Sequence, residues 1–448
     1  MGQKRDTTIS AKSETNDWLT QLMSKSYMRS QVLQVNKEYI EDRFNLVELP
    51  TSTSTSSMIH ALEIIKGNKN SSSSDEGDMM NEYDNICTEI YGLIHARFII
   101  TPHGIKMMDE KIYNQAYGQC QRLYCRGENL MPIGLSNFPG EHHMNLYCPK
   151  CNQIMRPFSS KHSKIDGSFF GRNFPQMYFM MYPRKRPKLN LNKWKINDYS
   201  DLDTCCCDGT IVPPRHSFRL VLHKISFDNL IFDPMSYPDI QSWLIQLPGN
   251  KILIHIPSTF IRENQPKLLP RILSMTPDDI AAKKLLNILA GSLVMKSPIT
   301  IDKTNFECLL LIYGMFHTKY TATDAGILKI KDIWTSGNFG TCMRQDCKMI
   351  SPNLFPISLC PRYNHYAVKY YCFSCQHAYH NNITKTRNIL DGAYYDYKLL
   401  YNTIIQYPAI LPNKRPSDYI PKLFEVRIHP EVFTYEEDDD SCPTAVNA

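Results

Sequence analysis

Two groups of four cysteines are the residues in this chain whose type and spacing point most directly to chemistry. The first group has the order C-x4-C, then C-x2-C, and consists of Cys120, Cys125, Cys148 and Cys151. The second group repeats that order with Cys342, Cys347, Cys372 and Cys375. Tetrahedral zinc binds four thiolates, and a short-spaced pair places two sulfurs on one edge of the tetrahedron. The repeated pattern favours two zinc sites over disulfides or unrelated buried thiols.

A zinc ion held by four cysteines has no coordination position left for water or substrate, so we expect both sites to be structural. Such a site contributes on the order of 10 kcal/mol to folding its own segment. His142 and His143 lie inside the first cysteine loop, but the quartet is complete without them. The sequence contains no nucleotide-binding glycine loop, GxSxG or HExxH motif, and we predict that the protein is not an enzyme.

The segments that must position the cysteines also occur twice. "YGLIHARFIITPHGIKMM" begins at Tyr91 and "YGMFHTKYTATDAGILKI" begins at Tyr313. Both have Tyr-Gly, a histidine four residues after the tyrosine, and a glycine near the end. Further along, "DGSFF" at Asp166 corresponds to "DGAYY" at Asp391. This conserved order of landmarks within one chain predicts two copies of one domain.

Each copy is predicted to begin with helices and to end in a small β-ribbon. Apolar residues recur at three- and four-residue steps from Ile86 to Phe98, which indicates an amphipathic helix. In the second copy, "TPDDIAAKKLLNILAGSL" predicts a helix with Thr276 as its N-cap and Pro277 in its first turn. The cysteine-bearing segments are short and rich in Gly, Pro and aromatic residues, so they need a metal to hold their structure.

Composition favours a globular protein of a reducing compartment. Apolar residues make up 42% and charged residues 21% of the chain, and the net charge is a mild +6. The longest apolar stretch, "FECLLLIYGMF", is too short to cross a bilayer, and we expect no membrane association. With no hydrophobic leader at the N-terminus, the expected location is cytoplasmic, nuclear or both. The basic run "YPRKRPKL" is a candidate nuclear import signal.

The first cysteine loop carries the segment "LMPIGLSNFPG", which is apolar and rich in proline. Apolar residues on a metal-stapled ribbon favour a surface that binds another protein. The alternative is a zinc ribbon that binds nucleic acid through lysine and arginine residues around the metal. We consider nucleic acid the less favoured partner because the loop itself is not basic.

Four segments together closely resemble the regulatory beta subunit family of casein kinase II. They are "DWLTQ…EYIEDRFNL", "YGLIHARFIITPHGI", "YCRGENLMPIGLSNFPGEHHMNLYCPKC" and "DGSFFGRNFPQMYFMMYP". The resemblance implies the α+β fold class: an all-α N-terminal lobe followed by a four-cysteine zinc ribbon, here repeated twice in the chain. It also implies a non-catalytic regulatory subunit of a Ser/Thr kinase, with paired ribbons and a tail that docks the catalytic subunit. Because this chain carries two copies, the ribbons are expected to pair as an internal pseudodimer or in a homodimer.

On this basis we divide the chain into two units joined by a connector. The first unit spans 8–189, with a helical lobe at 8–117 and a ribbon at 118–189. The connector spans 190–235 and contains a possible remnant of the first unit's tail. The second unit spans 236–430, with a lobe at 236–339 and a ribbon and docking tail at 340–430. An acidic tail follows at 431–448.

The resemblance also assigns candidate docking residues. Two aromatic positions of the family's docking hairpin fall on Phe424 and Val426, so one aromatic residue is missing in this chain. Phe218 is the aromatic residue in the remnant of the first tail, and Met177 matches a family position near the kinase contact. The missing aromatic residue leaves open a diverged beta-like protein that no longer docks kinase.

The sequence also offers two candidate phosphorylation sites, Ser72 and Ser73. They have Asp75 and Glu76 at the third position after them, the acidic pattern that the family's kinase prefers.

Overall fold

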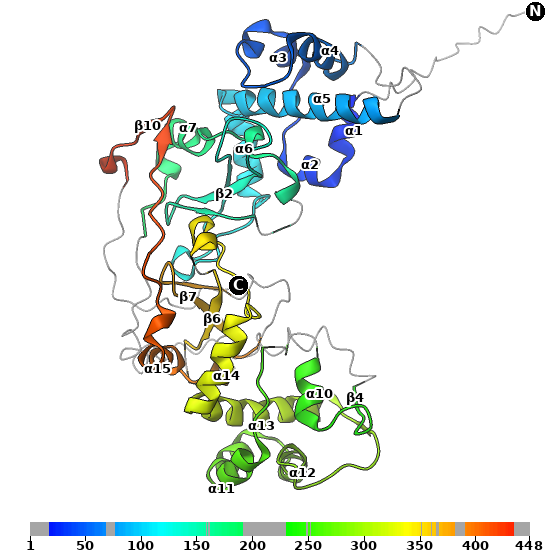
Figure 1. Cartoon of the computed structure of the whole chain (residues 1–448), viewed down its shortest axis with the longest axis vertical. Coiled ribbons are helices and arrows are strands. Elements are labelled where there is room, and N and C mark those ends of the chain that lie inside the picture. Colours follow the sequence, from blue (N-terminus) through cyan, green and yellow to red (C-terminus); the bar gives the residue numbers. More distant parts are fainter. Residues whose placement is uncertain are drawn as a thin grey trace, which may run out of the picture. The chain divides into compact units, whose positions relative to one another are not determined.

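The computed structural model describes residues 18–68, 77–157, 159, 162–190, 230–247, 250, 252–350, 352–359, 361–363, 367–380 and 390–433. The chain forms two compact units. Unit 1 comprises Met1–Gln119, Asn129–Lys188 and Tyr419–Thr434, and unit 2 comprises Cys120–Glu128, Leu189–Asp418 and Tyr435–Ala448. Both units combine helices with small antiparallel sheets, which confirms the predicted fold class and the duplication (Figure 1).

Unit 1 is built around one long helix, α5 (Gly77–Phe98), which packs against α4 (Thr55–Ile65). Its sheet has the order β1-β2-β3 with antiparallel pairing throughout. The other helices are α1 (Trp18–Ser24), α2 (Ser26–Gln31), α3 (Lys37–Glu41), α6 (Pro102–Tyr113) and α7 (Phe174–Met181). The strands are β1 (Met131–Ile133), β2 (Asn145–Cys148), β3 (Gln153–Met155), β9 (Lys422–Leu423) and β10 (Val426–Arg427). Short 3-10 helices are η1 (Arg43–Leu46), η3 (His162–Lys164), η4 (Gly167–Phe169), η5 (Pro183–Lys185) and η11 (Pro430–Val432).

Unit 2 repeats this order around α13 (Lys303–Thr321), which packs against α12 (Asp279–Leu289). Its larger sheet has the antiparallel order β6-β7-β8, and β4 pairs with β5. The other helices are α10 (Ile240–Gln246), α11 (Ser258–Met275), α14 (Asp324–Thr335) and α15 (Leu399–Gln406). The strands are β4 (Ile231–Phe232), β5 (Ile299–Thr300), β6 (Leu354–Ile357), β7 (Lys369–Cys372) and β8 (His377–Tyr379). Short 3-10 helices are η2 (Leu123–Cys125), η7 (Gln345–Met349), η9 (Gly392–Tyr394) and η10 (Pro408–Ile410).

One predicted helix start is wrong. Helix α12 begins at Asp279, and its N-cap is Asp278, whose carboxylate accepts hydrogen bonds from the amides of Ile280 and Ala281. Thr276 instead ends the preceding helix α11, because its hydroxyl donates to the carbonyl of Ile272 at 3.0 Å. An aspartate can supply the same cap as a threonine, and Asp278 lies only two residues after Thr276.

The Tyr-Gly landmark places a glycine where a helix meets the end of its ribbon. A Cβ atom at Gly92 in α5 would lie 2.3 Å from the ring of Phe169 in η4. A Cβ atom at Gly314 in α13 would lie 2.3 Å from the ring of Tyr394 in η9. Only glycine allows the aromatic ring to approach the helix backbone this closely, so the same packing is repeated in both copies.

The histidine of the same landmark is fully buried in each copy and is bonded on both sides. The amide of Leu33 donates to His95 Nε2 at 3.0 Å, and His95 Nδ1 donates to the carbonyl of Phe169 at 2.7 Å. In the second copy, the amide of Ile254 donates to His317 Nε2 at 3.3 Å, and Nδ1 donates to the carbonyl of Tyr394 at 2.6 Å. These bonds fix the neutral imidazole with its proton on Nδ1.

Within the residues that the structure describes, none of the helices combines the length and the apolar character needed to cross a bilayer.

The buried histidines predict that the fold weakens in mild acid. Burial lowers the pKa of His95 and of His317 to about 4, below the ordinary value near 6.5. The unfolded chain therefore binds more protons than the folded chain between these values, and stability is lost as the pH falls below 6.5. From pH 7 to pH 5, each histidine should cost about 2 kcal/mol of unfolding free energy, measurable by denaturant unfolding at the two pH values.

A matched comparison isolates these two side chains. The variant His95→Gln/His317→Gln should lose most of this pH dependence, whereas His142→Gln, at an exposed loop position, should keep it. An unchanged pH dependence in the double variant would contradict the assignment.

Candidate metal centres

The cysteines of each quartet are brought together by two turns of the backbone. In the first quartet, Cys125 ends η2, Cys148 ends β2, and Cys151 lies in the turn that leads into β3. In each C-x2-C pair, the residue after the second cysteine adopts the left-handed conformation, with φ 51° at Asn152 and 58° at Gln376. This conformation reverses the chain directly behind the sulfurs, so that the next strand pairs with the previous one.

The sulfurs of each quartet lie at distances that suit one metal ion. In each group, all four sulfurs lie within 4.8 Å of one another, and all eight cysteines are buried. In the second quartet, Cys342 Sγ lies 3.8 Å from Cys375 Sγ, and Cys372 Sγ lies 3.9 Å from Cys347 Sγ. A tetrahedron with metal–sulfur bonds of about 2.3 Å has edges of about 3.8 Å. A disulfide would require about 2 Å, so these sulfurs are spaced for a shared ion.

The protonation of the second quartet agrees with a shared ion. Burial raises the pKa of the Cys342 thiol well above its usual range. Burial also acts to raise the pKa of Cys375, but hydrogen bonds from the other three sulfurs outweigh it and lower that pKa well below its usual range. Hydrogen bonds from the neighbouring thiols therefore act on Cys375 in the opposite direction to its burial. A divalent cation would take the place of the remaining protons.

The two histidines of the first cysteine loop differ from the cysteines in their exposure to solvent. His142 and His143 are exposed, whereas the four cysteines are buried. Their exposure agrees with the expectation that the quartet is complete without them.

The predicted docking residues Phe424 and Val426 lie on a hairpin formed by β9 and β10 in unit 1. Phe424 and Glu425 form its two-residue turn, both in the left-handed region with φ 47° and 66°. Phe424 is 58% exposed and Val426 is 70% exposed. A bulky side chain at positive φ is strained, and such strain often marks a functional site.

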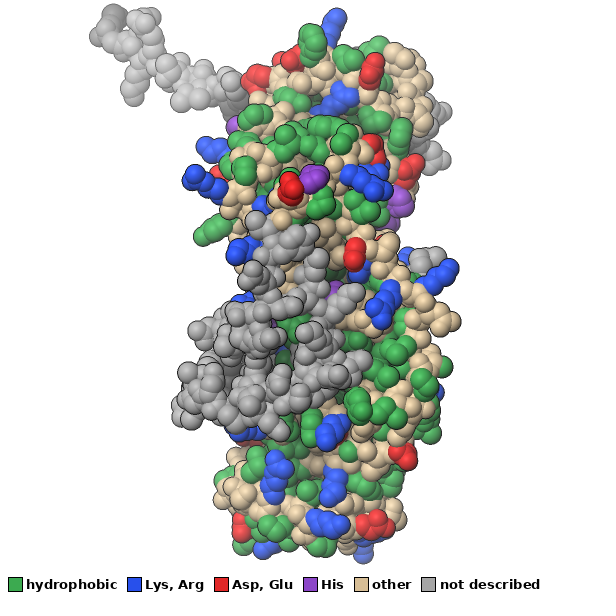
Figure 2. Space-filling view, turned by 90° about the vertical axis from the view of Figure 1, so that its left-hand side faces the viewer, with side chains coloured by type: hydrophobic (Ala, Val, Ile, Leu, Met, Phe, Trp, Pro, Cys, Tyr) green, Lys and Arg blue, Asp and Glu red, His purple; other side chains and the backbone are tan. Residues whose placement is uncertain are grey.

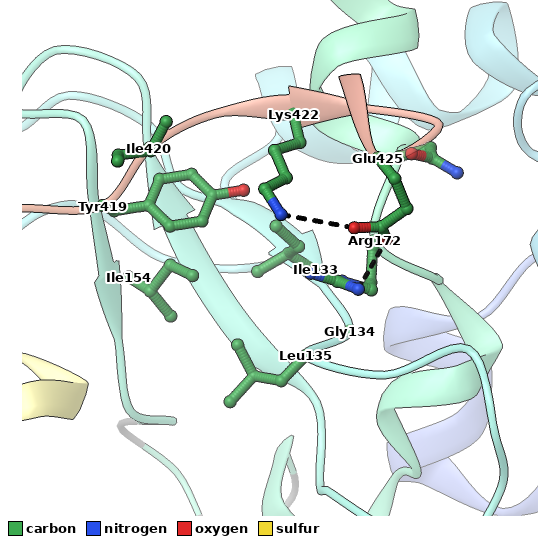
Figure 3. A pocket seen from close by; sticks show the side chains of 10 residues that line it. Ile133, Gly134, Leu135, Ile154, Arg172, Tyr419, Ile420, Lys422 and Glu425 are labelled. Atoms are coloured by element: carbon green, nitrogen blue, oxygen red, sulfur yellow. Dashed lines mark hydrogen bonds and ion pairs between the residues drawn. The ribbon is translucent and has the colours of Figure 1, made fainter. Parts of the chain in front are cut away.

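Polar contacts hold this hairpin on the rest of unit 1 (Figure 3). Glu425 accepts a hydrogen bond from Arg172 at 2.5 Å and from Lys422 at 3.4 Å. The amide of Phe424 donates to the Asn173 side chain at 2.8 Å. These partners fix the backbone of the turn while leaving the Phe424 side chain exposed. Sequence reasoning missed Glu425 and its partners, because a glutamate in a two-residue turn gives no recognisable turn signal.

The extended segment that leads to the hairpin packs on the first sheet. Tyr419 meets Tyr147 edge to face with ring centroids 5.8 Å apart, and the Asn152 side chain donates to the carbonyl of Tyr419 at 3.2 Å. A pocket of about 90 Å³ remains between this segment and the sheet, and its lining includes Ile133, Ile154 and Tyr419. Binding sites for small molecules are usually several times larger, so we interpret this pocket as a small gap in the packing.

The remaining predicted residues fall in two groups. Met177 lies on α7 and is partly buried. Phe218, Ser72 and Ser73 lie outside the described residues, so the tail remnant and the phosphorylation sites stay predictions.

A helical lobe followed by a small sheet with a buried cysteine quartet is present twice, which defines a duplicated domain with one candidate metal centre in each copy. The model of the casein kinase II regulatory subunit family matches residues 17–200 and again residues 239–427. The chain therefore belongs to the casein kinase II regulatory subunit family and carries two copies of its domain. Members of this family are non-catalytic, which confirms the prediction that the chain is not an enzyme.

Individual relatives agree with the family model. Casein kinase II subunit beta' of Drosophila melanogaster is 43% identical over 155 residues, which is 35% of this chain and 69% of that protein. Casein kinase II subunit beta' of Saccharomyces cerevisiae is 37% identical over 154 residues, which is 34% of this chain and 60% of that protein. Casein kinase II subunit beta-2 of Neurospora crassa is 33% identical over 178 residues, which is 40% of this chain and 60% of that protein. The chain thus spans 60% to 69% of the length of these relatives.

The quartets predict two metal ions per chain. Cys148→Ser and Cys372→Ser should each remove one ion, because three thiolates bind far more weakly than four. Cys87→Ala, a buried cysteine outside the quartets, should keep both ions. Metal analysis of the purified variants measures this directly. Removal of both ions by a chelator should also lower the melting temperature, since each site contributes on the order of 10 kcal/mol to folding its ribbon.

Proposed function

We propose that this chain is a non-catalytic regulatory subunit of a casein-kinase-II-like Ser/Thr protein kinase complex. Its two quartets hold structural zinc, its ribbons pair, and the Lys422–Arg427 hairpin docks a catalytic subunit. The observation that carries the proposal is the hairpin itself, which presents Phe424 and Val426 to solvent. The relatives are named as subunits of casein kinase II, which supports a catalytic subunit as the partner.

Zinc is the metal that the donor set favours. Four thiolates at the observed separations match tetrahedral coordination by sulfur, which zinc adopts in structural sites. Mg²⁺ and Ca²⁺ prefer oxygen ligands and do not suit a site built of sulfur alone. The buried position of all eight cysteines supports a structural role.

Contacts within unit 2 support pairing of the two ribbons inside one chain. The Cys120–Glu128 segment comes from the first ribbon but belongs to unit 2. There, Arg122 forms a β-bridge with Tyr379 of β8, and the amide of His380 donates to the carbonyl of Gln121 at 2.8 Å. The Arg122 side chain is 1% exposed and donates to the carbonyl of Asn190 at 2.8 Å. Arginine is rarely buried unless it is paired, so the buried Arg122 supports a close contact at this position.

The charge on one face of the protein gives no support to the nucleic-acid alternative. On the face that Figure 2 presents, the Lys and Arg side chains of the described residues are scattered among acidic and apolar ones and form no continuous basic band. Nucleic-acid binding relies on such a band to neutralise phosphates.

Retention of a casein kinase II catalytic subunit by the purified chain tests the proposal. Burying Phe424 contributes about 2 kcal/mol, so Phe424→Ala should weaken the complex roughly thirtyfold. Val426→Phe restores an aromatic residue at the second docking position and should tighten the complex. Phe44→Ala is a matched control, because Phe44 is 87% exposed on the lobe of unit 1.

Two other results would replace the proposal. Steep salt-dependent binding of DNA or RNA without kinase retention would indicate the zinc-ribbon nucleic-acid-binding protein. Absence of both activities would indicate a diverged member that no longer docks kinase.

Light scattering of the purified chain tests ribbon pairing within one polypeptide. The intramolecular model predicts a particle of 51.9 kDa. A dimer of chains that persists on dilution would contradict it, because the ribbons would then pair between chains.

A further inference from the structure

The second quartet has a hydroxyl group beside two of its sulfurs. Tyr379 Oη lies 3.1 Å from Cys375 Sγ and 3.3 Å from Cys342 Sγ. These two cysteines come from different pairs of the quartet, so the hydroxyl faces both halves of the site. Tyr379 is 1% exposed, and its position is set by β8, where it pairs with Tyr370 of β7.

Beside a metal-bound quartet, this hydroxyl can act only as a donor. Ligand thiolates carry no hydrogen, whereas a tyrosine keeps its proton up to about pH 10. Four thiolates around Zn²⁺ leave a net charge of about −2 in a buried site. A hydrogen bond from Tyr379 would stabilise that charge and hold Cys342 and Cys375 in place.

The first quartet has a different side chain at the corresponding position. Cys372 pairs with His377 in the second sheet, and Tyr379 follows two residues later. Cys148 pairs with Gln153 in the first sheet, and Met155 follows two residues later. Met155 is also buried, but its thioether has no hydrogen to donate. The two copies therefore differ at a residue that reaches the metal ligands in one of them.

We propose that Tyr379 is a positioning residue of the second metal centre and makes it slower to release zinc than the first. Tyr379 donates its hydroxyl hydrogen to the thiolates of Cys375 and Cys342, and Met155 at the corresponding position of the first centre has no hydrogen to donate. The proposal rests on zinc in both quartets, as argued above. It divides the two centres into a labile one and a durable one, although their ligands are the same.

Transfer of zinc from the full-length chain to an excess of a chromophoric chelator tests the proposal. The native chain should release its two ions in two phases of similar amplitude. Tyr379→Phe removes one oxygen atom and should speed the slow phase about tenfold, the usual effect of losing an outer-shell partner of a metal ligand. Met155→Leu is the matched control and should leave both phases unchanged, because leucine also donates no hydrogen bond.

A second variant assigns the phases without relying on Tyr379→Phe. Cys148→Ser disables the first centre, and the ion that remains should leave at the slow rate. Release at the fast rate from this variant would overturn the proposal. So would a rate for Tyr379→Phe equal to that of the native chain.

Spectroscopy distinguishes the loss of this hydrogen bond in Tyr379→Phe from a general loosening of the fold. In the Co²⁺-loaded chain, loss of a hydrogen bond raises the energy of the sulfur lone pairs. The sulfur-to-cobalt charge-transfer band of Tyr379→Phe should therefore move to lower energy, whereas simple loosening would speed release without moving it.

The zinc content and release rate of the native chain distinguish failure of the proposed metal centres from failure of the proposed role of Tyr379. A native chain that purifies without zinc and takes up none would refute the metal centres themselves. Two bound ions with a single release rate that Tyr379→Phe does not change would refute only the role of Tyr379.

Discussion

The packing of each copy depends on one neutral histidine that has no access to water. A buried imidazole is tolerated only when both of its nitrogens have partners, and the two partners of His95 come from opposite ends of its domain. Leu33 lies between the early helices α2 and α3, and Phe169 follows the sheet. Satisfying this side chain therefore requires the helical lobe and the ribbon to be assembled together. His317 imposes the same requirement through Ile254 and Tyr394.

This constraint explains why the Tyr-Gly-x-x-His landmark appears in both copies. The tyrosine bonds the same early segment as the histidine: Tyr91 donates to the carbonyl of Leu33 at 2.8 Å, and Tyr313 to that of Ile254 at 2.6 Å. The glycine between them makes room for the aromatic ring that follows the ribbon. Three neighbouring positions on one helix thus connect the start and the end of a domain, and the cysteine quartet lies in the ribbon between them.

The sequence predicted most reliably what depends on a few neighbouring residues. The quartets could be found because metal ligands restrict both residue type and spacing, and the duplication because landmarks recurred in order. The reasons for those landmarks were not predictable, since Phe169 and Leu33 are brought to His95 only by the tertiary fold. The turn at Phe424 and Glu425 lacks the Asn-Gly or Asp-Gly signature of its conformation. The start of α12 was misplaced because Thr276 and Asp278 are chemically equivalent as caps.

One segment of unit 1 comes late in the sequence, and this position affects how the protein folds during synthesis. Tyr419–Thr434 belongs to unit 1, and Asn152 bonds Tyr419 across 267 residues of sequence. A ribosome delivers residues from the N-terminus onward, so the first sheet waits for this segment until residues 189–418 of unit 2 have emerged. During that interval Tyr147, against which Tyr419 later packs, lacks its covering residue. Contacts over such long separations also form slowly. The apolar surface of the first sheet is therefore most open to chaperones, or to a wrong partner, during synthesis.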